Sequence, residues 1–119
     1  ALADASLLNQ AVSNLLTNAI NYTPAGGNIM LSTSLMQENG TSWVKIDVVD
    51  SGVGITEGEL GMIFDRFFRG SASQQTGAAG TGLGLSIVKE IVTRVGGKIT
   101  VQSQEGGGST FTIWLRAVL

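Results

Sequence analysis

The sequence contains neither cysteine nor histidine among its 119 residues. Without cysteine there is no disulfide and no thiolate metal site, which suits a reducing compartment. Without histidine, no imidazole in this chain can act as a general base, a metal ligand or a phosphate acceptor. Proline is also scarce, with one residue against 17 glycines. The chemistry of the chain must therefore come from other side chains and from glycine-rich loops.

Charge is low and shows no excess of basic residues. Seven Lys and Arg oppose nine Asp and Glu, so the net charge is −2 and the isoelectric point about 4.9. Because nucleic-acid binding requires a basic surface, we expect no nucleic-acid partner. No apolar run approaches the roughly 20 residues of a membrane span, and the first residues do not resemble a signal peptide. With 43% hydrophobic residues, residues 1–119 are expected to form one compact domain.

Hydrophobic spacing predicts helices and strands in one mixed domain. Helical periodicity covers residues 5–22 and 83–95, and Asp4 is a candidate N-cap of the first helix. Four strands are predicted at 28–36, 42–49, 98–103 and 109–115. A short helix is predicted at 56–64. Residues 70–80 are small, polar and aperiodic and are expected to be mobile. Helices packed on an antiparallel or mixed sheet make an α/β sandwich.

Two asparagines in the first helix, Asn14 and Asn18, stand four residues apart in an apolar pattern. Side chains at i and i+4 lie on the same side of a helix, so both amides face one place. Asn21 and Tyr22 follow one turn later. Amide oxygens are neutral, hard ligands that suit a Mg²⁺ ion carried in by a nucleotide. The pair therefore predicts a side of the helix that faces a ligand.

The segment Asp50-Ser51-Gly52-Val53-Gly54 follows the second predicted strand. Its glycines allow backbone to approach a flat ligand closely. A carboxylate here can accept a hydrogen bond from an exocyclic amine such as that of adenine. The alternative is a turn closed by an Asx-type bond. A calcium loop is disfavoured because no glutamate closes a 12-residue loop of the EF-hand kind.

The segment Gly80-Thr81-Gly82-Leu83-Gly84-Leu85 opens the second long helix. Exposed N–H groups at a helix start favour phosphate. The spacing fits neither the dinucleotide-binding fingerprint nor the Walker A loop. Phosphate binding and simple helix initiation both remain open for this segment taken alone.

Two further segments carry weaker signals. Residues 63–69 combine three aromatics with Arg66 and Arg69 just before the mobile stretch, so they can anchor a lid and reach phosphate. Anchoring of the aromatics in the core is the alternative. Residues 108–111 place Ser109 where its hydroxyl can support Asp50 or an ordered water, although a plain turn into a strand explains them as well.

Taken in order along the chain, these motifs resemble the ATP-binding domain of sensor histidine kinases. That domain belongs to a superfamily shared with gyrase, MutL-type repair proteins and heat-shock chaperones. The resemblance covers residues 4–116. It implies a two-layer α/β (α+β) sandwich of the Bergerat type, with about three helices on one face of a mixed five-stranded sheet. It also implies that ATP and Mg²⁺ bind between helix and sheet under a lid.

The resemblance assigns roles to residues by their positions in its boxes. Asn18 looks like the Mg²⁺ ligand and Asn14 like its supporting residue, and the expected catalytic residues are Asn14, Arg66 and Arg69. The positions expected to contact ATP come from all the boxes: Asn18, Asn21, Tyr22, Asp50, Gly52, Gly54, Ile55, Phe67, Gly80, Thr81, Gly82, Leu83, Gly84, Leu85 and Ser109.

Asn14 and Asn21 differ from what the superfamily often has at these places. The family often carries Lys or Arg at the place of Asn21, so a phosphate-binding charge is missing unless Arg66, Arg69 or Lys89 replaces it. The ATPases usually carry a general-base Glu at the place of Asn14, and an amide does not accept a proton near neutral pH. The resemblance therefore implies phosphoryl transfer to a histidine with little ATP hydrolysis.

The acceptor histidine must lie elsewhere, because this chain has none. The resemblance implies two partners, a His-bearing dimerisation domain of the same kinase and a downstream response regulator. We expect the fragment to be a monomer, the full kinase a homodimer, and the domain cytoplasmic even if its parent is anchored in a membrane. Two alternatives remain open: an ATPase or conformational clamp of the same superfamily, and a degenerate nucleotide-binding module.

Overall fold

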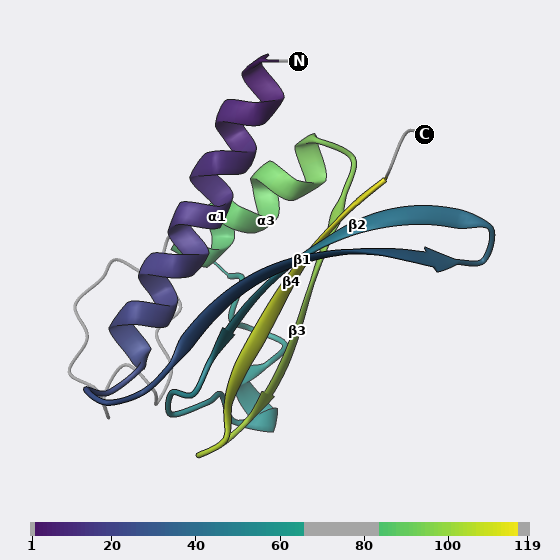
Figure 1. Ribbon diagram of the computed structural model, residues 1–119. Coiled ribbons are helices and arrows are strands. Elements are labelled where there is room, and N and C mark those ends of the chain that lie inside the picture. The colour runs from purple at the N-terminus through teal and green to yellow at the C-terminus, as the bar shows by residue number, and fades with distance from the viewer. Residues whose placement is uncertain (1, 66–83, 117–119) are drawn as a thin grey trace.

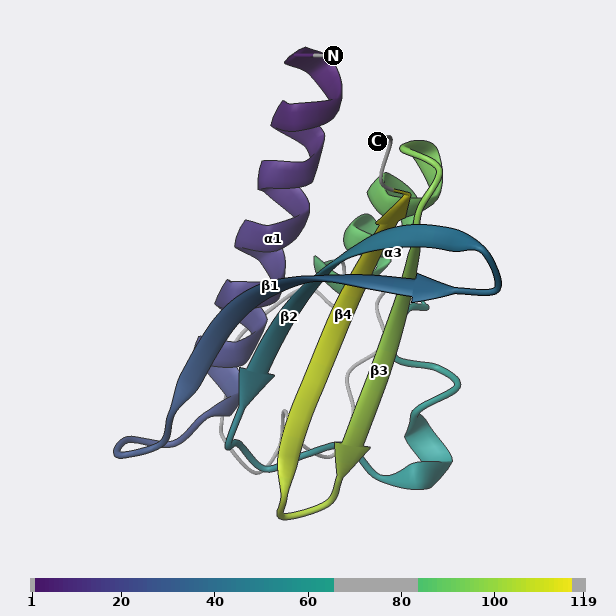
Figure 2. The same ribbon diagram turned by 45° about the vertical axis from the view of Figure 1, so that its right-hand side comes forward.

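The computed structural model describes residues 2–65 and 84–116. Its elements are α1 (Leu2–Tyr22), β1 (Ile29–Glu38), β2 (Thr41–Asp50), the 3-10 helix η1 (Glu57–Glu59), α3 (Gly84–Arg94), β3 (Lys98–Gln104) and β4 (Gly108–Arg116). The strands form one sheet in the order β1-β2-β4-β3, and each neighbouring pair is antiparallel. Both α-helices lie on one side of this sheet (Figures 1 and 2).

The expected two-layer sandwich is confirmed, whereas the expected numbers of strands and helices are not confirmed within the described residues. The resemblance implied a mixed sheet of five strands with about three helices. The described residues instead form four antiparallel strands, two α-helices and one 3-10 helix. Short hairpins join β1 to β2 and β3 to β4, and such connections produce antiparallel pairs. The spacing of apolar residues predicted these four strands.

Helix α1 begins before its apolar pattern does. It starts at Leu2, so Asp4 lies inside the helix and not at its N-cap. Its buried side is the row Ala11, Leu15 and Ala19, each at most 1% exposed, because residues four apart stack on one face. None of the described helices is long and apolar enough to cross a membrane.

The core lies between the two helices and the inner face of the sheet. A helix is confirmed within the predicted range 83–95, since α3 spans Gly84–Arg94 and buries Val88, Ile91 and Val92. The sheet adds Val48, Phe111 and Ile113, each at most 2% exposed. Each such side chain contributes about 1.5–3 kcal/mol when it is buried. This core holds the ends of β2, β3 and β4 in place beside α1.

The short α-helix predicted at residues 56–64 does not form. Only η1 is helical there, and Thr56 precedes it without a side-chain capping bond. A series of turns continues to Asp65, with the backbone N–H of Met62 donating to Glu59 at 2.9 Å. Two glycines, Gly58 and Gly61, explain the difference, since each costs a helix interior about 1 kcal/mol relative to alanine.

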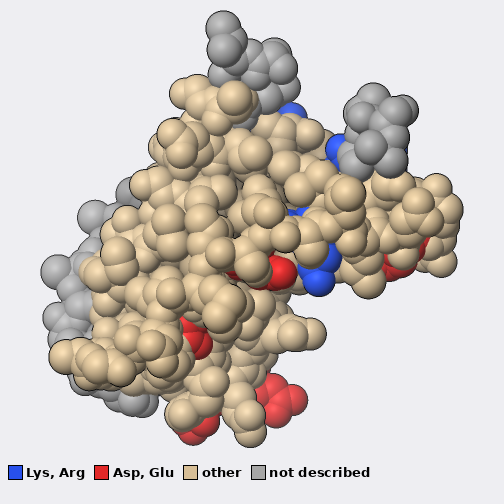
Figure 3. All heavy atoms as spheres, viewed as in Figure 1, with Lys and Arg blue, Asp and Glu red and all other residues tan. Residues whose placement is uncertain are grey.

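The outer face of the sheet, away from the helices, carries an aromatic and basic cluster. We call it the outer cluster: Trp43, Lys45, Lys98, Trp114 and Arg116. The two indoles meet edge to face with ring centroids 6.3 Å apart, and the Lys98 ammonium lies 4.8 and 5.0 Å from the two centroids. On the face of the molecule shown in Figure 3, most basic atoms lie above most acidic atoms, and the two kinds adjoin near the middle.

Candidate nucleotide site

Asn14 and Asn18 lie on one side of α1, as their spacing predicted. Together with Tyr22 they form a half-buried row beside the fully buried row of the same helix. Asn21 is exposed. The two amides therefore border the core without being enclosed by it, which leaves them available to a ligand.

Asp50 is the last residue of β2 and is 7% exposed. Its Oδ1 accepts a hydrogen bond from the backbone N–H of Gly52 at 2.9 Å, so the Asx-type turn does form. Burial raises the pKa of the Asp50 carboxyl, while backbone hydrogen bonds from Gly52 and Ser109 oppose the rise. A carboxylate has about four acceptor positions, so the turn leaves capacity for a ligand.

Gly52 and Gly54 lie where two stretches of backbone meet. A Cβ on Gly52 would lie 2.3 Å from the carbonyl oxygen of Tyr22, and one on Gly54 would lie 2.0 Å from that of Gln104. Gly54 also has a φ of +74°, which L-residues disfavour. The N–H of Val53 donates to the Tyr22 carbonyl at 3.3 Å. In the described structure, these glycines thus allow close approach between backbone segments and dock the loop against the end of α1.

A polar row crosses the inner face of the sheet at the level of Asp50. Asp50 pairs with Ser109, and Ser109 pairs with Ser103, so the three residues lie side by side on β2, β4 and β3. The Oγ atoms of the two serines are 2.8 Å apart. The Ser103 hydroxyl donates to the Gly108 carbonyl at 3.0 Å, and Ser103 Oγ accepts from the Ile55 N–H at 2.7 Å.

Ser103 was missed when the sequence was read by motif. A signal for it exists, because the β3–β4 hairpin turns at Gly106 and therefore pairs Ser103 with Ser109. The backbone N–H of Gly106 also donates to the carbonyl of Val53 at 2.8 Å. The hairpin and the loop after β2 are thus joined at two points.

The other predicted site residues fall into two groups. Gly84 begins α3, and Leu85 and Ile55 pack against the hydrophobic core. Ile55 reaches the polar row through its backbone N–H only. Several predicted residues lie outside the described part of the chain: Arg66, Phe67, Arg69, Gly80, Thr81, Gly82 and Leu83.

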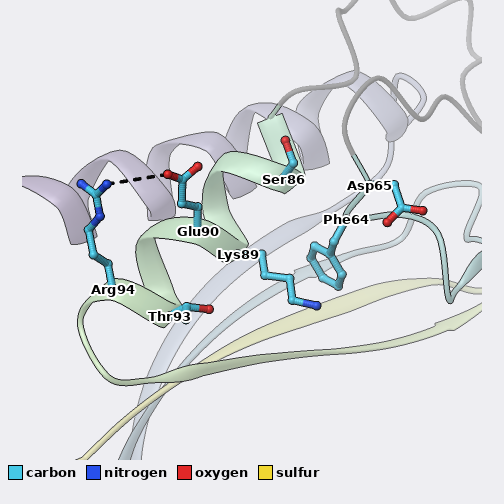
Figure 4. A pocket seen from close by; sticks show the side chains of 7 residues that line it. All are labelled: Phe64, Asp65, Ser86, Lys89, Glu90, Thr93 and Arg94. Carbon is cyan, nitrogen blue, oxygen red and sulfur yellow. Dashed lines mark ion pairs between the residues drawn. The ribbon is translucent and has the colours of Figure 1, made fainter.

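A groove of about 550 Å³ lies between α3 and the turn before residue 66 (Figure 4). Its lining consists of Phe64, Asp65, Ser86, Lys89, Glu90, Thr93 and Arg94. The Lys89 ammonium lies 5.6 Å from the Phe64 ring centroid, and Phe64 packs edge-on against Phe111. Phe64 is thus anchored against the core, as the alternative interpretation of residues 63–69 proposed. Among the described residues, neither the α1 amides nor Asp50 lines this groove, whereas Lys89, the suggested replacement for a missing phosphate-binding charge, does.

The donor chemistry of the site fits a metal that a nucleotide brings with it. Among the described residues, no three Asp, Glu, His or Cys side chains come together as a metal site. Mg²⁺ prefers oxygen ligands and commonly combines one or two protein donors with substrate phosphates. The amide oxygens on α1 supply donors of this kind.

Comparison with known proteins identifies the family. Residues 3–119 match the family model described as "Histidine kinase-, DNA gyrase B-, and HSP90-like ATPase", and the chain belongs to this family. The resemblance to the ATP-binding domain of two-component sensor histidine kinases is confirmed by its relatives.

Two curated relatives illustrate the similarity. The chain is 41% identical to the sensor histidine kinase Hik2 of Synechocystis sp. over 125 residues, covering 98% of this chain and 29% of that protein. It is 47% identical to the sensor histidine kinase ZraS of Escherichia coli over 113 residues, covering 95% and 22%. The chain thus spans less than a third of either relative.

Solved structures share the fold. The mycobacterial sensor histidine kinase MprB superposes with a TM-score of 0.74 at 33% identity, covering 93% of this chain and 70% of that one. Full-length ShkA, solved in complex with AMPPNP, superposes with a TM-score of 0.76 at 29% identity, covering 95% and 22%. The sandwich described above is therefore the fold of histidine kinase catalytic domains.

Proposed function

We propose that this domain binds ATP with Mg²⁺ and positions the γ-phosphate for transfer to a histidine on a separate dimerisation domain of the same kinase. The observation that supports this best is the docking of the loop after Asp50 onto the end of α1, through Val53 and Tyr22. Asn18 lies one turn before Tyr22. A metal-binding amide and a base-reading carboxylate therefore belong to adjoining parts of one end of the sandwich.

Asp50 is the proposed reader of the base. As a carboxylate it only accepts hydrogen bonds, so it favours the exocyclic amine of adenine over the carbonyl of guanine. Its burial strengthens this preference, because a buried acceptor that meets another acceptor loses its solvation without compensation. The Gly52 N–H holds Oδ1 in place at 2.9 Å.

The amides of α1 are the proposed metal-binding residues. Asn18 donates its amide oxygen to Mg²⁺, and Asn14 supports it from the preceding turn. The ion, when bound, supplies positive charge to the phosphate oxygens. Arg66, Arg69 and the segment from Gly80 to Gly84 are the proposed phosphate contacts. Because Asn14 stands where a general base would be needed, water is not activated and hydrolysis is slow.

A calorimetric titration with an ATP analogue tests the nucleotide site. We expect binding by the wild-type chain, stronger with Mg²⁺ than without it, and we expect Asn18→Ala to abolish most of the Mg²⁺ enhancement. Asn9→Ala is the matched control, since Asn9 is an exposed amide on the same helix. A wild-type chain with no affinity for adenine nucleotides would instead identify a degenerate module.

A phosphoryl-transfer assay tests the reaction. The chain is mixed with the separately produced His-bearing dimerisation domain and labelled ATP, and we expect acid-labile phosphohistidine on that domain. Steady release of phosphate by the chain alone, without label transfer, would favour the ATPase or clamp alternative. In the proposed parent kinase, a homodimer with this domain in the cytoplasm, the phosphoryl group then passes to a response regulator.

A further inference from the structure

We propose that Ser103 is a positioning residue that orients the Ser109 hydroxyl, so that Ser109 and Asp50 together present only hydrogen-bond acceptors to the base. This inference rests on the proposed nucleotide site and adds a residue to its adenine specificity. It concerns the direction of one hydrogen bond, between the hydroxyls of Ser103 and Ser109 at 2.8 Å.

The direction follows from counting hydrogens at Ser103. A serine hydroxyl has one hydrogen to donate and two lone pairs to accept with. The Ile55 N–H, at 2.7 Å, can only donate to Ser103 Oγ. The Gly108 carbonyl, at 3.0 Å, can only accept. The single hydroxyl hydrogen of Ser103 is therefore donated to the Gly108 carbonyl. Toward Ser109, the Ser103 hydroxyl can only accept a hydrogen bond.

The Ser109 hydroxyl can then act only as a hydrogen-bond acceptor on the side that faces away from Ser103. Its hydrogen points along the sheet toward Ser103, so its free lone pairs are what a ligand or an ordered water meets. Ser109 is also the β-sheet partner of Asp50, whose ionised carboxylate has no hydrogen to donate. Two neighbouring acceptors match a group with two hydrogens, such as the amino group of adenine, either directly or through water. They oppose the carbonyl of guanine.

The backbone around the row is closely packed. Gly108 has a φ of +84°, and a Cβ there would lie 2.1 Å from the carbonyl oxygen of Asp50. The carbonyl that takes the Ser103 hydrogen is therefore held by a close contact between β4 and β2. Ile55 packs against the core, so packing places both backbone groups that set the hydrogen direction.

The test compares ATP and GTP analogues by calorimetry, with thermal unfolding measured on the same samples. In Ser103→Ala the Ser109 hydroxyl loses its acceptor and is free to donate. We expect the ratio of ATP to GTP affinity to fall by about 3- to 10-fold, the range of one hydrogen bond. Ser103→Thr, which keeps the hydroxyl, should restore the ratio.

The matched control is Thr100→Ala, on the same strand but on the outer face. Thr100 accepts a hydrogen bond from the Trp114 indole at 2.8 Å, so its loss affects stability without touching the polar row. We expect it to leave the nucleotide ratio unchanged. If Ser103→Ala lowers both affinities equally, or only the melting temperature, the residue is merely structural and the inference is wrong. If the wild-type chain binds neither analogue, the proposed nucleotide site itself fails.

Discussion

The polar row on the inner face of the sheet and the outer cluster hold their polar side chains in different ways. On the inner face, Asp50 and Ser109 are each 7% exposed. Asp50 Oδ1 accepts a hydrogen bond from the Gly52 N–H at 2.9 Å, and the hydroxyls of Ser109 and Ser103 are hydrogen-bonded to each other at 2.8 Å. On the outer face, Lys98 is exposed and rests on the rings of Trp43 and Trp114. Each buried polar group needs its own hydrogen-bond partner, whereas an exposed cation remains hydrated. Specific recognition is therefore expected from the inner face.

The largest contrast is in the aromatic residues of the two faces. Phe111 on the inner face is 2% exposed, and Phe111→Ala should lower the free energy of unfolding by about 3–5 kcal/mol through the cavity it leaves. Trp43 on the outer face is only half-buried. Chemical denaturation of Phe111→Ala and Trp43→Ala compares them, and equal losses would contradict the assignment of the core to one face.

The next effect concerns the backbone beneath the polar row. Gly108→Ala combines a left-handed φ with a Cβ in contact with the Asp50 carbonyl. We expect a loss of about 2–3 kcal/mol in unfolding free energy, in the range of strain at special backbone positions. The control is Gly58→Ala, where a Cβ meets nothing within 4 Å. Stability is measured by denaturant-induced unfolding. If both variants are as stable as the wild type, β4 can shift relative to β2 to accommodate the added methyl group.

Asp50→Asn separates function from stability on the inner face. We expect the affinity for ATP to fall about 10- to 100-fold, the range for losing a hydrogen bond to a charged group. The preference for adenine over guanine should fall as well. The free energy of unfolding at neutral pH should rise slightly, because the raised pKa of Asp50 means that ionisation is less favourable in the folded than in the unfolded chain.

The sign of this effect can be checked by thermal melts across pH. A folded-state pKa above the unfolded one means that the folded protein binds the extra proton. The wild type should therefore gain stability relative to Asp50→Asn as the pH falls from neutral through the raised pKa. A relative loss of wild-type stability over that range would show that the hydrogen bonds from Gly52 and Ser109 outweigh the burial.

The smallest effect is expected on the outer face. Lys98→Gln removes an ammonium that lies within 5.0 Å of two ring centroids, and exposed cation–π contacts contribute about 0.5–1 kcal/mol. We expect a loss of this size in unfolding free energy and no change in nucleotide affinity. A calorimetric change in ATP binding would mean that the two faces are coupled.

The long helices and the four strands were predictable from residue spacing. The residues at which they begin and end were predicted less accurately. β1 was expected to end at residue 36 but continues to Glu38. The reason is a two-residue turn at Asn39 and Gly40, with φ of +52° and +79°, which is typical of a tight hairpin. The helix at 56–64 failed because two glycines outweighed one capping pattern.

The candidate site was predictable as a set of motifs but not as an arrangement. The spacing of Asn14 and Asn18 placed both amides on one side of α1, and the structure agrees. The partners of Gly52 and Gly54 were not predictable, because the Tyr22 and Gln104 carbonyls are distant in sequence. Ser103 belonged to no motif and acquired its place through the pairing of β3 with β4.

The sequence by itself determined the local features of this protein: its periodic helices, its strands, and the absence of any histidine or general-base glutamate at the place of Asn14. These depend on residues within a few positions of one another. Only the tertiary structure decided that Asp50, Ser109 and Ser103 form one row, and that the row faces the helices. Strand register is set by hairpin geometry and by burial of one face, and a shift by one residue would turn every side chain to the other side.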